Sequence, residues 1–171
     1  MYPEIETAKK ENRREINLSG SEIDKRILEN KGHLDNHLFK LDQLNLLKIS
    51  ACPSLTMIPD SIGMLENLST LMLFENKIEV IPLAITALTK LKVLDMSYNC
   101  IKAVPVELSN LHQLHSLNLS NNLIEEFIEF PKETKLGILN LSNNKLKSLD
   151  LESKGFEGIL EVITYYDDDD I

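Results

Sequence analysis

Few residues of this sequence have the types and the spacing that chemistry requires. In the run GHLDNH, His33 and His37 stand four positions apart with Asp35 between them, and such a set could share a metal ion. A polar run of this kind is explained more simply as a solvated loop or cap, and we favour that interpretation. We therefore expect no metal and no other cofactor.

The remaining histidines and cysteines show no catalytic pattern. His112 and His115 flank a leucine, and no cysteine or carboxylate is paired with either by motif. Cys100 follows Asn99 as an isolated thiol. The sequence also lacks a glycine-rich phosphate loop and the GxSxG and HExxH patterns. We predict that the chain is not an enzyme.

Composition indicates a compartment. Two cysteines, Cys52 and Cys100, do not make a disulfide framework. The N-terminus is charged from Glu4 onward and lacks the apolar run of a secretory signal. No stretch of about 18 apolar residues is available to span a membrane. We expect a cytoplasmic protein in a reducing environment, without membrane contact.

The elements that would position any site come from an internal repeat. The closing residue of this repeat steps by 24, 23, 23 and 22 positions, and three copies continue with an aliphatic–proline pair. Such a period indicates a solenoid, because one repeat of this length cannot bury a core by itself. The pattern is LxxLxLxxN, and its copies are LNLLKISAC (44–52), LSTLMLFEN (68–76), LKVLDMSYN (91–99), LHSLNLSNN (114–122) and LGILNLSNN (136–144).

This pattern resembles the leucine-rich repeat of intracellular proteins. The resemblance implies an α/β solenoid, a right-handed horseshoe with a parallel β-sheet on the concave face and short helices on the convex face. The period-two alternation of LxL favours strands, and segments such as LAITALTKL carry apolar residues at helical spacing. Asparagine at the closing position can hydrogen-bond backbone of the neighbouring coil, whereas Cys52 donates only weakly.

The chain divides into three parts on this interpretation. Residues 1–40 form a helical N-terminal cap, 41–150 form five repeats, and 151–171 form a partial sixth repeat with an acidic tail. Within the cap we expect a polar helix over 3–14, a strand over 15–20, and a helix that Ser21 caps and that runs to Gly32.

The last part resembles the strand of a sixth repeat. Val162 and Thr164 would point inward, although Leu160 with Val162 remains an alternative. No convex segment or polar cap follows this strand, so we expect the chain to be a fragment or a truncated form.

A more specific resemblance lies near the N-terminus. The run ENRREINLSGSEIDKRILENKG, followed by HLFKLDQLNLLKISACPSL, is similar to the start of the leucine-rich-repeat-containing protein forty-seven family. Members of that family continue into a half similar to the B3/B4 domain of the phenylalanyl-tRNA synthetase beta chain, which this sequence lacks. The resemblance implies an alternative function, that of the N-terminal domain of a translation- or RNA-associated protein.

Charge bears on the kind of partner. Residues 1–48 carry nine basic and nine acidic residues, so residues 49–171 hold the whole net charge of −9. An acidic repeat region disfavours nucleic acid and is compatible with a basic protein partner. We expect a monomer that binds another protein. RNA contact, if any, would use Lys9, Lys10, Arg13 and Arg14 near the N-terminus.

The candidate binding site is an apolar patch on the solvent side of the sheet. Phe74 stands where the other four repeats carry serine, and Met72 lies two positions before it. An apolar centre with a charged rim is typical of a binding hot spot. The alternative is that these residues only stiffen the sheet by cross-strand pairing. The patch comprises Leu46, Met72, Phe74, Val93 and Tyr98, and its rim comprises Lys48, Glu75 and Asp95.

The size of the sheet limits this site. Five strands spaced ~4.8 Å apart and roughly 15 Å long present a face on the order of 300 Å². A standard stable interface buries about 800 Å² on each partner. We therefore expect the face to bind weakly unless loops or the cap contribute.

Overall fold

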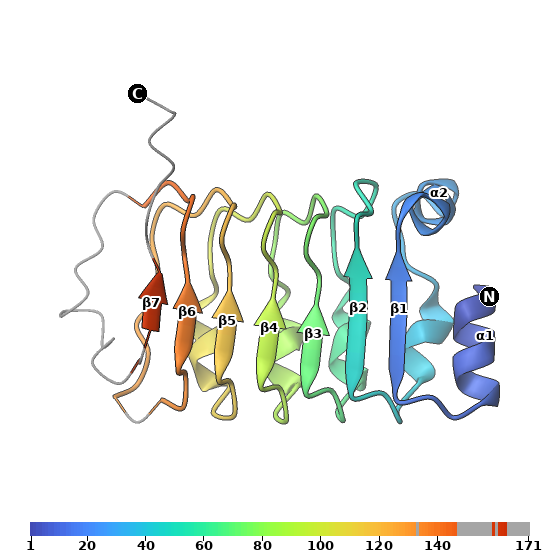
Figure 1. Cartoon of the computed structure of the whole chain (residues 1–171), viewed down its shortest axis with the longest axis horizontal. Coiled ribbons are helices and arrows are strands. Elements are labelled where there is room, and N and C mark those ends of the chain that lie inside the picture. The colour runs from blue at the N-terminus through green and yellow to red at the C-terminus, as the bar shows by residue number, and fades with distance from the viewer. Residues whose placement is uncertain (133, 147–158, 160, 164–171) are drawn as a thin grey trace.

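Seven parallel strands form one sheet in the computed structural model, which describes residues 1–132, 134–146, 159 and 161–163 (Figure 1). The strands follow one another in chain order, as a solenoid requires, because each coil adds one strand beside the last. This confirms the predicted fold class. The strands are β1 (Glu15–Ser19), β2 (Leu46–Ser50), β3 (Thr70–Met72), β4 (Val93–Asp95), β5 (Ser116–Asn118), β6 (Ile138–Asn140) and β7 (Glu161–Ile163).

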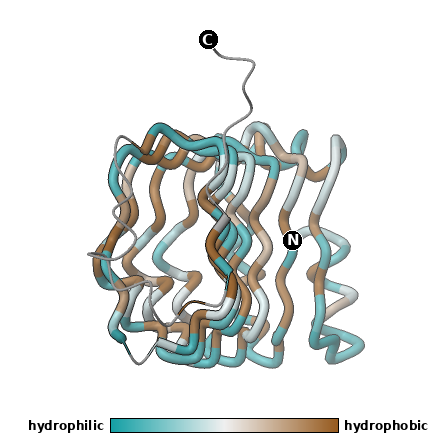
Figure 2. The backbone as a smooth tube through the Cα atoms, turned by 60° about the vertical axis from the view of Figure 1, so that its left-hand side comes forward, coloured by the Kyte–Doolittle hydropathy of each residue, from teal (hydrophilic) through white to brown (hydrophobic). Residues whose placement is uncertain are grey.

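The core fills the inside of the coils. Leu71 of β3 and Leu94 of β4 are paired in register and have no exposed surface, and the same inward row continues through Leu117 and Leu139. Figure 2 shows the coils stacked along one axis, with hydrophilic positions concentrated in the turns. Leucine at period two therefore faces inward on every coil, which is the burial that the repeat predicts.

Short 3₁₀ helices cover the opposite side of the coils: η1 (Asn36–Lys40), η2 (Asp60–Met64), η3 (Leu83–Ala87) and η4 (Val106–Asn110). A proline directly precedes each of the last three helices. This proline has an extended backbone, and its ring fixes φ between −65° and −73°. The predicted convex helices are thus present, but each is only five residues long.

The closing asparagines join neighbouring coils. Asn99 accepts the N–H of Ile78 at 3.0 Å and donates from Nδ2 to the carbonyl of Leu73 at 2.8 Å. Asn76, Asn122 and Asn144 make the same kind of bonds, and all four are buried. At the first coil the N–H of Cys52 donates to Asn76, but its own thiol lies 3.3 Å from the carbonyl of Ser50.

The N-terminal cap differs from the prediction in three details, one of which is that the second helix ends at Glu29 and not at Gly32. Helix α1 (Pro3–Lys10) ends before residue 14, because Asn12 adopts a left-handed backbone with φ 51° and the chain turns there. Helix α2 (Ser21–Glu29) begins after Gly20, so Ser21 is its first residue and not its N-cap. Gly20 has φ 87°, which glycine adopts without the steric cost that other residues carry. Figure 1 shows α1 beside β1 at this end of the sheet.

The C-terminal strand places Val162 inward, as both predicted alternatives do. Val162 pairs with Leu139 in the inward row and packs against the core. Leu160, Thr164 and the acidic tail lie outside the described residues. The three-part division of the chain remains a prediction, and β1 of the cap shares the sheet of the repeats. Within the described ranges, no helix is long and apolar enough to cross a membrane.

Candidate functional site

The side chains that point away from the core form rows across the sheet. In the middle row, Lys48 of β2 pairs in register with Met72 of β3, and Met72 pairs with Asp95 of β4. The row continues through Asn118 of β5 to Asn140 of β6. Neighbouring strands of a sheet lie about 4.8 Å apart, so these side chains are neighbours across the sheet.

At the ends of three strands, two polar side chains form hydrogen bonds with each other. At the end of β4, the N–H and the hydroxyl of Ser97 donate to Asp95 Oδ1 at 2.9 and 2.7 Å. Ser120 bonds Asn118 and Ser142 bonds Asn140 in the same manner, with hydroxyl distances of 2.8 Å in both coils. The three serines are buried. The pair is therefore a structural device that closes the strand end.

Strand β3 replaces this pair with Met72 and Phe74. Both side chains are half-buried, and the neighbouring Lys48 holds its Nζ atom 4.9 Å from the centre of the Phe74 ring. The backbone is unaffected, because β3 pairs with β4 in the register that β4 keeps with β5. Neither apolar side chain belongs to the buried core.

The remaining predicted residues occupy two different places. Leu46 and Val93 lie in the row before Met72, and both pair with Thr70, which separates them. Tyr98 and Glu75 lie beyond the strand ends, in turns with φ 54° and 56°. Tyr98 is 56% exposed, and both residues line a hollow of about 330 Å³ on this rim. The eight residues thus form a face and an adjoining rim.

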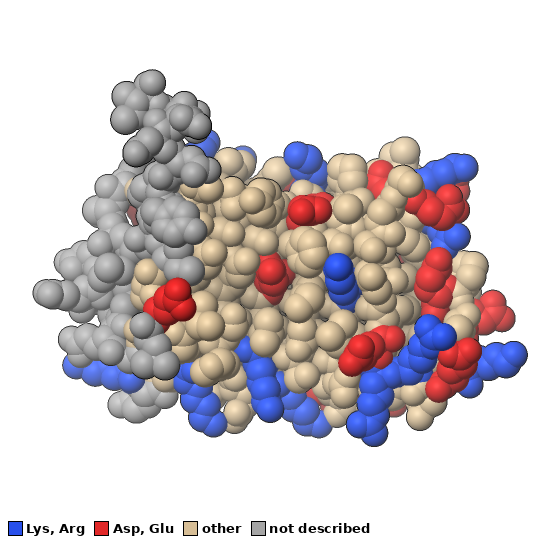
Figure 3. Space-filling model, viewed as in Figure 1, with Lys and Arg blue, Asp and Glu red and all other residues tan. Residues whose placement is uncertain are grey.

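Charge is sparse on the face of the sheet. Figure 3, viewed onto the strands, shows a mostly uncharged surface with isolated acidic and basic side chains. Lys48 and Asp95 flank Met72 in the middle row, so one cation and one anion border the apolar pair. Asp95 already accepts hydrogen bonds from Ser97, which leaves Lys48 as the charge with the fewest polar partners.

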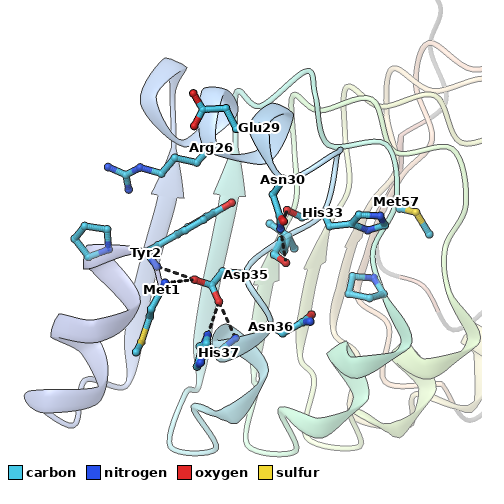
Figure 4. A pocket seen from close by; sticks show the side chains of 13 residues that line it. Met1, Tyr2, Arg26, Glu29, Asn30, His33, Asp35, Asn36, His37 and Met57 are labelled. Carbon is cyan, nitrogen blue, oxygen red and sulfur yellow. Dashed lines mark hydrogen bonds and ion pairs between the residues drawn. The ribbon is translucent and has the colours of Figure 1, made fainter.

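The histidine run belongs to the N-terminal cap. Asp35 accepts the backbone N–H of Tyr2 at 2.7 Å and contacts His37 Nδ1 at 2.7 Å (Figure 4). These residues and His33 line a hollow of about 830 Å³. Among the described residues, no three His, Cys, Asp or Glu side chains are grouped closely enough to hold a metal ion. The arrangement ties α1 to the loop before η1.

The structure predicts low reactivity for the Cys52 thiol. Burial, together with the nearby Asp24 carboxylate, raises the pKa of the Cys52 thiol to about 11, so the thiolate is scarce at neutral pH. Cys100 is half-exposed, and both cysteines are free.

Sequence reasoning missed two features of this face. Thr70, between Leu46 and Val93, interrupts the apolar patch with a hydroxyl. The contact of Lys48 with Phe74 was also missed, although a column-by-column alignment places the two residues on adjacent strands, two positions apart. That diagonal placement is the signal that could have identified it.

Comparison with known proteins agrees with this architecture. Residues 66–124 match the family model described as leucine rich repeat, and no curated protein matches the chain significantly. A leucine-rich-repeat protein of Leptospira interrogans is 29% identical with a TM-score of 0.64, over 78% of this chain and 35% of its own. Internalin C2 of Listeria monocytogenes is 20% identical with a TM-score of 0.62, over 77% and 56%.

A third solved structure is the ectodomain of the receptor kinase GASSHO1/SCHENGEN3 of Arabidopsis thaliana in complex with CASPARIAN STRIP INTEGRITY FACTOR 2. It is 22% identical with a TM-score of 0.63, over 94% of this chain and 25% of its own. The chain covers less than two thirds of each of these three structures. The repeat pattern, the seven-stranded parallel sheet and these likenesses together identify the fold as a leucine-rich-repeat solenoid, with residues 66–124 matching the repeat family itself.

Proposed function

We propose that this chain is a non-catalytic interaction module, an adaptor or scaffold, that binds another protein through the face around Met72 and Phe74. One observation carries the proposal. Between β3 and β6, only β3 exchanges the self-bonded polar pair for two large apolar side chains. The exchange leaves the strand register unchanged and adds nothing to the buried core, which favours contact with a partner.

The charges that border the pair suggest the chemistry of the partner segment. A partner with an apolar anchor would cover Met72 and Phe74, and an acidic group beside that anchor would meet Lys48. Asp95, on the other side of Met72, would favour a basic group. Opposite charges at the two ends would set the direction in which the segment crosses the sheet.

A structural neighbour supports the class of partner by analogy of fold. The Arabidopsis receptor kinase ectodomain is a complex with CASPARIAN STRIP INTEGRITY FACTOR 2, so a leucine-rich-repeat solenoid holds a ligand there. This analogy concerns the fold and carries no residue onto this chain. Other parts of the proposal are a cytoplasmic location, which the free thiols of Cys52 and Cys100 support, and a monomeric state.

The test restores the polar pair to β3. Met72→Asn combined with Phe74→Ser reproduces the residues of β5 and β6, so the variant should fold as well as the original protein. Proteins captured from a cell extract would be quantified for both forms. The matched control, Leu28→Ser with Val106→Asn, removes two apolar side chains that are 65% and 62% exposed elsewhere.

The expected result is that at least one partner is lost with the Met72/Phe74 variant and retained with the control. The purified partner should then bind the Met72/Phe74 variant at least about tenfold more weakly than it binds the original protein, as expected when a hot spot is truncated. Equal capture by all three proteins would contradict the proposal.

The translation-associated role is a second hypothesis, and it rests on the N-terminal resemblance alone. Lys9, Lys10, Arg13 and Arg14 are exposed, and Arg13 already pairs with Glu11 at 2.6 Å. Measured RNA affinity with a steep salt dependence, abolished by reversing these four charges, would favour this hypothesis. RNA affinity that survives the reversal would count against it.

A further inference from the structure

A second surface of this molecule is defined by charge. It lies at the amino-terminal edge of the sheet, in the turns that lead into β4, β5 and β6. We define the basic edge as the exposed residues Lys90, Lys92, His112, His115, Lys132 and Lys135. One acidic residue of these turns, Glu133, lies outside the described residues. Figure 3 shows Lys and Arg side chains along this lower border, beneath the tails of the strand arrows of Figure 1.

Hydrogen bonds hold the three turns together. The N–H of His115 donates to the carbonyl of Lys92 at 2.8 Å, and the N–H of Gly137 donates to the carbonyl of His115 at 2.8 Å. His115 Nδ1 lies 3.1 Å from the carbonyl of Lys135. The basic side chains are thus carried on adjacent coils whose positions the backbone fixes.

Two lysines of the basic edge are bonded to neutral groups. Lys90 donates to Asn67 Oδ1 at 2.6 Å and Lys135 donates to Gln113 Oε1 at 3.2 Å, so both are bonded to neutral amides. In the described part of the chain, no lysine of the basic edge forms an ion pair with a carboxylate. Neutral partners orient an ammonium group and leave its field available to a ligand.

The opposite edge of the sheet has a different composition. The turns that follow the strands also carry exposed lysines, namely Lys77, Lys102 and Lys145, but they are interspersed with Glu75, Glu79, Glu125 and Glu126. In the described turns around β4, β5 and β6, lysines therefore predominate on the amino-terminal edge, whereas the opposite edge mixes both signs, in a protein whose net charge is −9.

A small hollow adjoins the basic edge. It measures about 150 Å³ and is lined by Ser109, His112, Pro131 and Thr134. Thr134 Oγ1 accepts the N–H of Leu136 at 3.2 Å, which leaves the proton of its hydroxyl available as a donor. A carboxylate in this hollow would find a hydroxyl donor and an imidazole beside the lysines.

We propose that the basic edge binds a short acidic segment of a protein partner. The contiguous cations extend over three coils, because Asp42 and Glu66 occupy the turns before β2 and β3 and separate them from Arg13 and Arg14 before β1. A long polyanion would meet those carboxylates and the overall negative field, whereas three or four carboxylates would feel mainly the local charges. The described turns into β4, β5 and β6 also carry no Phe, Tyr or Trp, so only the imidazoles of His112 and His115 could stack on nucleotide bases. These observations favour a peptide over a nucleic acid.

The inference is independent of the proposed face around Met72, although the two surfaces adjoin. Lys92 directly precedes Val93 at the start of β4, so a partner that covers the face could continue onto the edge. Such an extension would add the contact area that the small sheet face lacks.

The test uses a fluorescein-labelled octaglutamate peptide and the whole chain, with binding followed by fluorescence anisotropy at about 0.02 M and about 0.15 M salt. The variant combines Lys90→Glu, Lys92→Glu and Lys135→Glu. The control combines Lys77→Glu, Lys102→Glu and Lys145→Glu, which changes the net charge equally on the opposite edge. We expect the edge variant to bind about tenfold more weakly or worse and the control to stay within about twofold.

Three results would overturn the inference: no binding of the peptide at low salt, an equal loss in both variants, or tighter binding of an oligouridylate of equal length through the same lysines. The last result would assign the surface to nucleic acid. If the glutamate variant does not fold by circular dichroism, replacing the same three lysines with glutamine should still weaken binding, and unchanged affinity would refute the inference. A negative result here would not contradict the proposed binding face around Met72. That proposal is tested separately, by comparing the partners captured before and after Met72 and Phe74 are replaced.

Discussion

Lys48 of β2 holds its Nζ atom 4.9 Å from the centre of the Phe74 ring, which lies just beyond β3. The two side chains come from adjacent coils, and the ammonium group covers one face of the ring. This contact stabilises an aromatic residue that the core does not hold. It also brings a positive charge next to the apolar pair, where a partner would bind.

Replacing Lys48 with methionine should cost little stability. A cation–π contact at an accessible site contributes about 0.5–1 kcal/mol, and methionine keeps most of the aliphatic contact with the ring. We expect the free energy of unfolding in urea to fall by about 1 kcal/mol or less. The control is Lys102→Met, which replaces an exposed lysine in the turn that follows β4. A loss above about 2 kcal/mol would show that Lys48 has a structural role that this contact does not explain.

Removing one closing asparagine should be costly. Asn122 accepts the N–H of Ile101 at 3.0 Å and donates to the carbonyls of Met96 and Leu119 at 2.9 and 3.0 Å. Asn122→Ala strands these buried groups, so we expect a loss of about 1–3 kcal/mol. Thermal and urea unfolding would measure it, with the exposed Asn110→Ala as control. An unchanged unfolding curve would mean that the coils do not depend on this ladder.

Stability should fall at acid pH through Asp35. Burial raises the pKa of Asp35, but hydrogen bonds from His37 and Tyr2 outweigh it and hold the pKa below the usual value of 3.8. A lowered pKa means that the contribution is complete above the pKa of the unfolded chain and is lost as pH falls through the lower, folded value. The loss therefore lies below about pH 4.

Urea unfolding from about pH 6 to about pH 2 would reveal this dependence. Asp35→Asn should give a shallower decline below about pH 4 than the original protein, because its amide does not titrate. The exposed Asp60→Asn is the control and should follow the original curve. Parallel curves for all three proteins would exclude Asp35 as the source.

The two thiols should react at different rates. Because its burial raises its pKa to about 11, Cys52 carries almost no thiolate at neutral pH and is also inaccessible. Iodoacetamide followed by mass spectrometry should modify Cys100 first and leave Cys52 intact until the protein unfolds. Denaturant should abolish the difference. Equal labelling of both thiols in the folded protein would contradict the buried position of Cys52.

The repeat made most of the fold predictable. Leucines at fixed spacing identify which side chains must be buried, and the closing residues, from Cys52 to Asn144, mark where each coil turns. The ends were predicted less well, since cap elements do not repeat. The N-cap role expected for Ser21 was wrong because Gly20 takes that position with a positive φ, a backbone state that residue spacing does not encode.

The candidate site was predictable in part. Aligning the repeats identified Met72 and Phe74 as exceptions, since their columns otherwise carry polar residues in β4 to β6. The same alignment could not separate Tyr98 and Glu75 from the sheet face, because both follow the strand register directly and only their left-handed turns move them to the rim. The basic edge was also missed, because summing charge along residues 49–171 hides its segregation in space.

By itself, the sequence of this protein determined which residues are buried and how often the chain turns. Both depend on short-range spacing and on the need of each coil to hide its leucines from water. Only the tertiary structure decided which side chains meet across coils, such as Lys48 with Phe74 and His115 with Lys135. Those contacts join residues about two dozen positions apart, and they depend on strand register and side-chain direction, which a one-dimensional period does not specify.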